Sequence, residues 1–319
     1  MHVKLYYGFG HTHDLILHGH LFRNKPRKRK IYSDNIILNT LHLLRLFFLR
    51  PVKNAEVKLH WQGMTFEQTT ANDGYFRFEW SSPHSLHAGW YPVEVRFSKN
   101  GDTVTGTGEL YVPHITQYGF ISDIDDTVLV SHSAFILKRL KELLTSNPRT
   151  RDIFNDVARH YHLLATSNTS PEEPNPFFYV SSSEWNMYDY LVEFFRYNHM
   201  PKGAFLLNHV KRWYEFFQSG NTEHSGKLIR IVWILQAFPK QQFVLLGDNS
   251  QKDPLLYNSI ARRYPDRIHA VYIRNARPGK EAESRNILAE LQKDTGIHTC
   301  FFRNSDEAIS HSKSIGLIS

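Results

Sequence analysis

Three carboxylates and a hydroxyl follow an apolar run near the middle of the chain. The segment from Gly119 to Val128 reads Gly-Phe-Ile-Ser-Asp-Ile-Asp-Asp-Thr-Val, an Asp-x-Asp-x-Thr pattern at Asp123, Asp125 and Thr127. Carboxylates a few ångströms apart disfavour each other's ionisation, and a hard divalent cation commonly neutralises such a cluster. The first carboxylate of the pattern can attack a phosphorus atom, and the second can donate a proton to the leaving oxygen. The segment therefore predicts metal-assisted phosphoryl transfer.

Further groups suited to this chemistry follow in order along the chain. The apolar run Phe177–Val180 predicts a buried strand, and it ends in Ser181–Ser183, where a hydroxyl can hydrogen-bond a phosphate oxygen. Lys227 opens an apolar helix predicted from Leu228 to Phe238. Its ammonium can neutralise a phosphorylated aspartate beside the helix N-terminus.

A second acidic loop follows another apolar run, Phe243–Leu246. It has the form Gly-Asp-x-x-x-x-Asp, with Asp248 and Asp253 as its carboxylates. Two acidic loops at the C-terminal ends of two strands would meet at one edge of an open parallel sheet. Because Pro254 comes next, Asp253 has a second interpretation as the N-cap of a helix, and the two roles are compatible.

Several neighbouring residues have structural interpretations. A calcium loop of the EF-hand type needs a Gly at the sixth position and a closing Glu, and the residues from Val128 to Val130 supply neither. Asp126 is expected to be structural, at a helix or turn N-terminus. Glu184 and Asp189 are expected in the first turn or on the solvent face of a helix predicted from Trp185 to Tyr197.

Histidine and cysteine do not indicate a second kind of metal site. The nineteen histidines are scattered, no His-Glu-x-x-His pattern occurs, and Cys300 is the one cysteine of the chain. A thiolate or histidine metal centre is therefore not expected, and an internal disulfide is excluded.

The ordered motifs resemble those of the haloacid dehalogenase superfamily of phosphatases, over roughly residues 118–305. More narrowly, segments 178–185 and 246–254 resemble the phosphatidate phosphatase family of the actin-patch-protein type. The Asp-x-Asp-x-Thr motif of that family is like the one in lipins.

The resemblance implies a catalytic role for each motif. Asp123 would be the nucleophile that forms an aspartyl-phosphate, Asp125 would be the general acid and then the general base, and Thr127 completes the motif. Ser181 would bind the transferred phosphoryl group, with Ser182 as a rival because the strand end is uncertain by a residue.

The resemblance also implies a Mg²⁺ cofactor and a role for the second acidic loop. Asp248 would hold the ion together with Asp123 and the backbone carbonyl of Asp125. Asp253 would bind the water shell of the ion or orient Lys227, which would stabilise the charge of the phosphoryl group. Phosphoryl transfer depends mostly on positioning and charge neutralisation, and a metal with one lysine provides both.

The composition is that of a globular protein with room for two domains. The chain has 319 residues, 22% of them charged and 14% aromatic, and its net charge is +7. This charge suits an anionic interface or a phosphorylated substrate. The start of the chain lacks the pattern of a signal peptide, so a cytoplasmic location is the default expectation. No nucleic-acid partner is expected.

The organisation changes near residues 113–118. The part before this point contains short alternating segments, and the turns at Asn72-Asp73-Gly74 and Asn100-Gly101-Asp102 are hairpin signals. We predict an antiparallel β-sandwich domain over residues 1–117, and residues 55–78 resemble a transthyretin-like accessory sandwich. After Tyr118, strands alternate with helices, which predicts a doubly wound α/β domain over residues 118–319. With the resemblance, this is a haloacid-dehalogenase-like catalytic domain. The expected strands of the first domain are Asp14–Phe22, Glu56–Trp61, Phe66–Thr70, Tyr75–Trp80, Trp90–Ser98 and Thr103–Val112.

An insertion at about residues 25–50 interrupts the first domain. It combines the cationic run Lys25–Lys30 with a helix candidate from Ile36 to Arg50. That helix is too short and too polar to span a bilayer, which needs roughly twenty mostly apolar residues, so no transmembrane segment is expected. It either packs on the protein or lies on a membrane surface with the basic run at anionic headgroups, and packing is favoured.

Three functions follow as hypotheses. The leading one, from the resemblance, is Mg²⁺-dependent hydrolysis of phosphatidate to diacylglycerol, with peripheral contact to a membrane surface. The alternatives are hydrolysis of a soluble phosphometabolite or nucleic-acid end phosphate with the same residues, and a non-catalytic lipid-binding module. The complete set of motif residues argues against the last.

Overall fold

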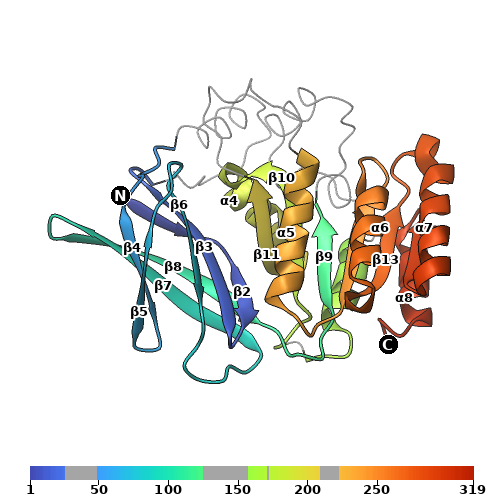
Figure 1. Ribbon diagram of the computed structural model, residues 1–319, viewed down its shortest axis with the longest axis horizontal. Coiled ribbons are helices and arrows are strands. Elements are labelled where there is room, and N and C mark those ends of the chain that lie inside the picture. The colour runs from blue at the N-terminus through green and yellow to red at the C-terminus, as the bar shows by residue number, and fades with distance from the viewer. Residues whose placement is uncertain (26–48, 125–156, 171, 209–222) are drawn as a thin grey trace.

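The computed structural model contains two sheets that lie side by side (Figure 1). It describes residues 1–25, 49–124, 157–170, 172–208 and 223–319. The insertion expected at 25–50 lies almost entirely outside these ranges, as do Asp125, Asp126 and Thr127. None of the helices in the described ranges has the length and apolar content needed to cross a membrane.

The N-terminal sheet has eight strands in the order β1-β3-β2-β8-β7-β4-β5, and β6 pairs with β3. Neighbouring strands are antiparallel except β2 and β8, which are parallel. The parallel pair joins the group β1, β3 and β2 to the group β8, β7, β4 and β5, so that they form one continuous sheet. The sequence pattern did not reveal the short strands β1 and β2. The strands are β1 (His2–Leu5), β2 (Gly8–His11), β3 (Asp14–Phe22), β4 (Glu56–Trp61), β5 (Met64–Thr69), β6 (Tyr75–Trp80), β7 (Gly89–Lys99) and β8 (Asp102–Val112).

This sheet curls around its own core. Strand β4 alternates between buried and more exposed residues, as its alternating sequence requires. The ring of Trp80 on β6 lies 5.6 Å from that of Trp61 on β4 and 6.1 Å from that of Phe66 on β5. The two ends of the sheet therefore approach each other, and side chains from β1 and from β3 to β8 share one apolar cluster.

The hairpin signals in the sequence correspond to tight turns. Asn100 and Gly101 have φ values of 52° and 87°, and they connect the paired residues Lys99 and Asp102. Two consecutive positive φ angles are typical of a type I′ turn. Gly74 has φ of 79°, and a Cβ there would lie 2.6 Å from the Leu21 carbonyl oxygen, so this turn requires glycine.

The second sheet has six parallel strands in the order β11-β10-β9-β12-β13-β14. The chain runs outward from β9 to β11, and then returns to β12 on the other side of β9. Ligands of open parallel sheets bind at the carboxyl ends of the strands where the order reverses, which here is next to β9. The strands are β9 (Gly119–Asp123), β10 (Phe177–Glu184), β11 (Gly203–Asn208), β12 (Phe243–Asp248), β13 (Ile268–Arg274) and β14 (His298–Phe302).

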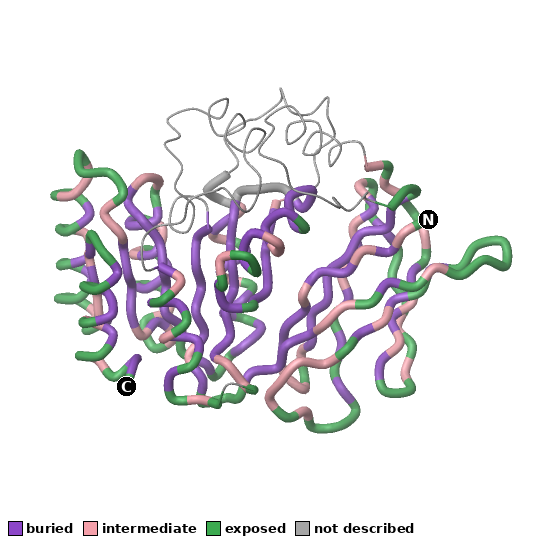
Figure 2. Tube along the Cα trace, turned by 180° about the vertical axis from the view of Figure 1, so that it is seen from behind, coloured by how far each residue is buried: buried purple, intermediate pink, exposed green. Residues whose placement is uncertain are grey.

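Helices cover both faces of the parallel sheet. One apolar cluster joins α3, α4 and α8 to residues such as Phe120 and Tyr179, and the other joins α5, α6 and α7 to residues such as Ile121 and Phe178. Successive strand residues thus face opposite layers, and the central strands β9 and β12 are buried along their whole length (Figure 2). The helices are α3 (Val157–Thr166), α4 (Tyr188–Tyr197), α5 (Glu223–Ala237), α6 (Asp253–Arg263), α7 (Glu281–Thr295) and α8 (Ser305–Ser314), with the 3₁₀ turns η1 (Trp185–Met187), η3 (Pro265–Arg267) and η4 (Pro278–Lys280).

The two sheets share buried contacts along their seam. The ring of Tyr6, just after β1, stacks on Trp185 at a centroid distance of 4.1 Å. Phe9 on β2 contacts Phe178 on β10 at 5.3 Å. Because both contacts belong to the clusters of the parallel sheet, the N-terminal sheet forms part of the support of β10.

Candidate active site

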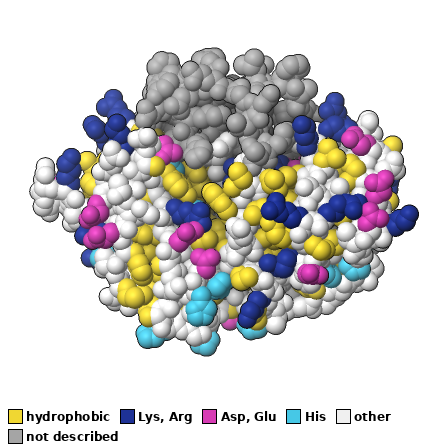
Figure 3. Space-filling model, in the orientation of Figure 1, with side chains coloured by type: hydrophobic (Ala, Val, Ile, Leu, Met, Phe, Trp, Pro, Cys, Tyr) yellow, Lys and Arg dark blue, Asp and Glu magenta, His cyan; other side chains and the backbone are white. Residues whose placement is uncertain are grey.

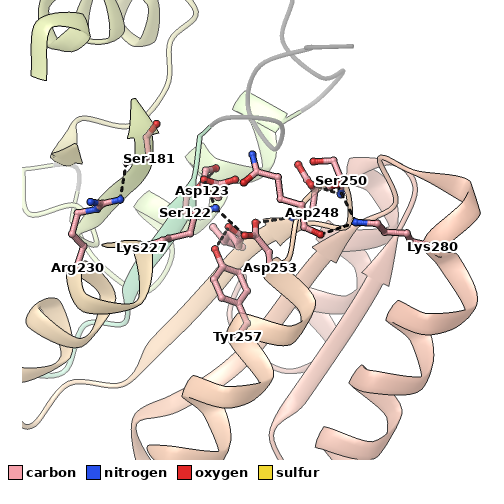
Figure 4. Close-up of polar contacts among 12 residues, drawn as sticks. Ser122, Asp123, Ser181, Lys227, Arg230, Asp248, Ser250, Asp253, Tyr257 and Lys280 are labelled. Carbon is pink, nitrogen blue, oxygen red and sulfur yellow. Dashed lines mark hydrogen bonds and ion pairs between the residues drawn. The ribbon is translucent and has the colours of Figure 1, made fainter. Parts of the chain in front are cut away.

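The parallel sheet and its helices bring the described residues of the predicted site to one edge (Figure 4): Asp123, Ser181, Lys227, Asp248 and Asp253. Asp123 ends β9, Asp248 ends β12, and Ser181 lies on β10 immediately after the pair Val180 and Asp123. Asp123, Asp248 and Ser181 are all fully buried. Fold topology thus juxtaposes three residues from segments that are far apart in sequence.

Lys227 connects the two acidic segments. Its Nζ atom lies 3.1 Å from Oδ1 of Asp123 and 2.9 Å from Oδ1 of Asp253. The side chain is 3% exposed, so its ammonium is taken out of water together with its partners. A buried charge of this kind is tolerated only when it is paired and hydrogen-bonded. Because Lys227 lies in the first half of α5, its ammonium can reach both carboxylates.

Asp253 points into the site and does not cap its own helix. Helix α6 begins at Asp253, Lys252 is its N-cap residue, and no side-chain cap bond forms. The second carboxylate oxygen of Asp253 accepts a hydrogen bond from the Asp248 amide at 3.4 Å. The N-cap interpretation of Asp253 is therefore wrong, because the carboxylate is engaged by Lys227 and by the adjacent acidic loop. Asp253 thus contacts Lys227, the residue that it is predicted to orient.

The glycine before Asp248 is required by this packing. A Cβ at Gly247 would lie 2.7 Å from Oδ2 of Asp253 and 2.7 Å from Cε2 of Tyr257. The hydroxyl of Tyr257 donates to the Leu246 carbonyl at 3.1 Å. The Gly-Asp sequence of the motif thus lets α6 approach the end of β12.

The loop after Asp248 is held by two sets of hydrogen bonds. The amide of Ser250 donates to Oδ1 of Asp248 at 2.6 Å. The ammonium of Lys280 donates to the carbonyls of Ser250 and Gln251 at 3.2 and 3.0 Å. These bonds fix the orientation of one Asp248 oxygen before any ligand binds.

Strand β10 changes register where its serines begin. Its pairing with β11 shifts between Val180 and Glu184, which marks a bulge or irregularity at the sheet edge. Arg230 donates to the Ser181 carbonyl at 3.1 Å and so anchors this segment to α5. The side chains of Ser182 and Glu184 lie outside the described residues, so both serines stay candidates for phosphate binding. Asp189 lies exposed in the first turn of α4, as the sequence predicted.

Three supporting residues escaped the sequence interpretation. Arg230 follows Lys227 by three residues, so helical spacing alone would have placed both on one side of α5. Tyr161 shares a hydrogen bond of 2.8 Å with Ser122, next to Asp123, and burial raises the pKa of this tyrosine. Arg274 on β13 lies opposite Asp248 on β12 in the register of the two strands, and burial lowers the pKa of its guanidinium to about 10. No motif marks the last two.

The donors at this edge suit a hard cation. The carboxylates of Asp123, Asp248 and Asp253 provide only oxygen ligands, which Mg²⁺ prefers. Lys227 supplies one positive charge for the two carboxylates that it contacts. Within the described ranges, no group of three or more His, Cys, Asp or Glu side chains is arranged to hold a metal ion. The predicted set also includes Asp125, which lies outside these ranges.

Sequence comparison identifies relatives that match part of the chain. A family model described as the catalytic domain of phosphatidate phosphatase APP1 matches residues 118–275. Phosphatidate phosphatase APP1 of Saccharomyces cerevisiae is 31% identical over 157 residues, which make up 49% of this chain and 25% of the yeast protein. An uncharacterized protein of Schizosaccharomyces pombe is 24% identical over 217 residues, covering 66% of this chain and 34% of that protein. The chain therefore spans about a quarter to a third of the length of these relatives.

Comparison with solved structures adds little. A carbohydrate acetylesterase from Xanthomonas citri aligns with 95% of this chain and 72% of its own, at 9% sequence identity and a TM-score of 0.34. A likeness of this degree supports no argument about fold or chemistry. The segment matched by the family model contains every predicted site residue from Asp123 to Asp253.

Proposed function

We propose that this chain, which belongs to the phosphatidate phosphatase APP1 family through its segment 118–275, is a Mg²⁺-dependent phosphomonoester hydrolase that converts phosphatidate to diacylglycerol and phosphate. The observation that carries the proposal is the buried contact of Lys227 with Asp123 and Asp253 at the carboxyl edge of the parallel sheet. A haloacid-dehalogenase-like class for domain 118–319, with a β-sandwich-like accessory domain over 1–117, forms part of the same proposal.

In the first step, a carboxylate oxygen of Asp123 attacks the phosphorus atom. The bond between phosphorus and the glycerol oxygen breaks, and Asp125 donates a proton to that oxygen as diacylglycerol leaves. Lys227 is already 3.1 Å from the attacking carboxylate, so it can hold the oxygen in position and stabilise the charge of the phosphoryl group.

In the second step, water releases phosphate from the aspartyl-phosphate. Asp125, now ionised, removes a proton from the water molecule, which attacks the phosphorus atom and restores the Asp123 carboxylate. The Arg230 guanidinium donates to the carbonyl of Ser181, which follows Val180, the residue of β10 that pairs with Asp123, and a hydroxyl there can bind a phosphoryl oxygen. Ser182 is the alternative donor.

The oxygen donors at this edge support the proposed requirement for Mg²⁺. Asp123 and Asp248, with the backbone carbonyl of Asp125, would hold Mg²⁺, and Asp253 would act through Lys227 or the water shell of the ion. When bound, Mg²⁺ supplies Lewis-acid neutralisation of the phosphoryl oxygens. The protein contributes the fixed orientation of Asp248, through the Ser250 amide and the Lys280 ammonium.

Phosphate release should be measured with phosphatidate in detergent mixed micelles and with two soluble esters, p-nitrophenyl phosphate and glycerol 3-phosphate. We expect Mg²⁺-dependent turnover that is fastest with phosphatidate and is abolished by EDTA. Asp123→Asn should reduce the rate by about 10⁴-fold or more, since it removes the nucleophile. Equal or faster turnover of the soluble esters would refute the lipid substrate, and an unchanged rate in Asp123→Asn would refute the nucleophile.

A further inference from the structure

Helix α5 carries large apolar residues on its outer side as well as on its inner side. Its inner side chains, Ile231, Ile234 and Leu235, are almost fully buried in the cluster beneath the parallel sheet. On its outer side, Ile229 is 47% exposed and Trp233 is 39% exposed. These two residues are four positions apart, so they lie next to each other on the helix surface.

The fold itself does not require such an outer side. Helix α7 covers the same face of the sheet with Leu288 and Leu291 inward, and its exposed positions include Glu283, Arg285 and Glu290. That polar outer side is normal for a helix that packs on a sheet, whereas a helix that is apolar all round has a second apolar environment. The apolar outer side of α5 therefore indicates a further contact.

The exposed apolar residues of α5 lie beside the catalytic edge. Ile229 is two residues after Lys227, and Leu255, which is 50% exposed on α6, is two residues after Asp253. Two residues advance a helix by about 200°, so these side chains point away from the site while their neighbours point into it. Helices α5 and α6 cover the same face of the sheet (Figure 1).

Basic side chains accompany this apolar group. The guanidinium of Arg77 on β6, which also pairs with Glu79, lies 4.8 Å from the ring centroid of Trp233. Lys252 and Arg277 are exposed in the loops at the catalytic edge. Figure 3 shows hydrophobic side chains interspersed with Lys and Arg side chains across the middle of this side of the molecule.

We propose that Ile229, Trp233 and Leu255, with the basic residues Arg77 and Lys252, form a docking face for an anionic lipid surface. We refer to these five residues as the docking face. The inference rests on the proposed function, because phosphatidate is itself a component of an anionic lipid surface. It assigns the contact to described residues of the catalytic domain and of β6, instead of to the insertion at 25–50.

The chemistry of the docking face matches a lipid surface. Protruding apolar residues can enter the boundary between headgroups and acyl chains, where a tryptophan is especially favourable because its ring is apolar and its N–H is polar. Lys and Arg side chains beside them contact anionic headgroups. The overall charge of +7 adds long-range attraction to the same surface.

The test is cosedimentation of the full chain with vesicles of phosphatidylserine and phosphatidylcholine that contain no phosphatidate. We expect wild-type protein to sediment with these vesicles, and to do so less at high salt or with phosphatidylcholine alone. The double variant Ile229→Asp/Trp233→Asp should bind at least about tenfold more weakly, because two inserted apolar side chains are replaced by anions. The matched control is Ile115→Asp, because Ile115 is 54% exposed and precedes β9, at the edge of the sheet opposite the catalytic edge. This variant should bind the vesicles as wild type does.

Two further measurements keep the outcome decisive. Turnover of p-nitrophenyl phosphate by the double variant should equal that of wild type, which shows that the fold and the site are intact. Vesicle binding that is absent in wild type, or unchanged in the double variant, would overturn the inference. A wild-type dimer that the double variant dissociates, without vesicle binding, would overturn it in favour of a contact between two copies. Because the vesicles contain no substrate, this result is independent of whether phosphatidate is hydrolysed.

Discussion

The two sheets of the molecule bury different kinds of polar groups. In the N-terminal sheet, two buried histidines contact tyrosine hydroxyls: His18 Nδ1 lies 2.5 Å from the Tyr75 hydroxyl, and His20 Nδ1 lies 2.9 Å from the Tyr6 hydroxyl. Burial lowers the pKa of His18 to about 3, which keeps this imidazole neutral. In the parallel sheet, a buried ammonium contacts two buried carboxylates. Removing charges from water is far more costly than removing neutral groups, so a fold that only needs stability has little reason to do so. This difference supports the proposal that the chemistry takes place at the parallel sheet.

The ion pair between Lys58 and Glu67 in the N-terminal sheet is exposed to solvent, unlike those of Lys227. Lys58 contacts Glu67 at 2.5 Å across β4 and β5, and both side chains are about half exposed. Such pairs contribute little to stability, because water screens them. Lys58 and Lys227 therefore form ion pairs of similar length in opposite environments.

The largest expected effect comes from removing the buried lysine. Lys227→Met leaves the carboxylates of Asp123 and Asp253 without the ammonium between them, which should lower the free energy of unfolding by about 3–5 kcal/mol. Phosphatase activity should fall by at least about 10³-fold, because the charge of the phosphoryl group is no longer stabilised. Urea unfolding and phosphate release measure the two effects.

Lys58→Met is the control on the other sheet, and it should leave both unfolding and activity unchanged. If the two lysine variants lost the same stability, buried and exposed ion pairs would not differ in this protein, and the comparison of the sheets would fail.

A second variant tests whether the two sheets are independent. Tyr6 is 2% exposed, stacks on Trp185 and contacts Tyr188 at 4.5 Å, so Tyr6→Ala creates a cavity in the seam. We expect a loss of about 3–5 kcal/mol in the free energy of unfolding, seen by tryptophan fluorescence and by circular dichroism together. Tyr6→Phe keeps the ring and loses only the bond to His20, so it should cost about 1 kcal/mol.

Separate fluorescence and dichroism transitions in Tyr6→Ala, with the transition of the parallel sheet unmoved, would show that the N-terminal sheet does not support β10. The seam would then be a contact between independent domains.

The smallest expected effect is a dependence on pH that both sheets share. Burial lowers the pKa of His18 in the N-terminal sheet and of His160 on α3 from 6.5 to about 3. Between pH 6.5 and 3, the unfolded chain binds protons at these residues and the folded chain does not, so stability falls as the pH falls. Above pH 6.5 neither state binds them, and their contribution is constant. From pH 7.5 to 6.0, each histidine should reduce the free energy of unfolding by under about 1 kcal/mol.

Urea unfolding at several pH values measures how steeply the free energy of unfolding depends on pH. His160→Asn should flatten this dependence, whereas substitution of the exposed His84 should not. A wild-type slope of zero between pH 6.5 and 5 would mean that these histidines bind protons in the folded protein.

Local patterns in the sequence anticipated many elements of the structure. Alternation placed β4 and β6 at their observed bounds, and the Asn-Gly pair placed the hairpin between β7 and β8. The same patterns missed β1 and β2, because strands of four residues are too short to show a period. They also ended β10 at Val180, although the strand continues to Glu184, because serines carry no apolar signal.

The sequence by itself determined which residues of the site are chemically able to act. The spacing in the Asp-x-Asp-x-Thr segment and in the second acidic loop depends only on local chain geometry, so Asp123 and Asp248 were identifiable at the ends of apolar strands. What only the tertiary structure decided is which groups meet. From the sequence, Asp253 could be a helix cap or a partner of Lys227, and the structure shows that it contacts Lys227. Arg274 belongs to no motif, and it lies opposite Asp248 only because strand order places β12 between β9 and β13. The physical reason is that short motifs record local geometry, whereas the pairing of buried charges depends on which distant segments the core brings together.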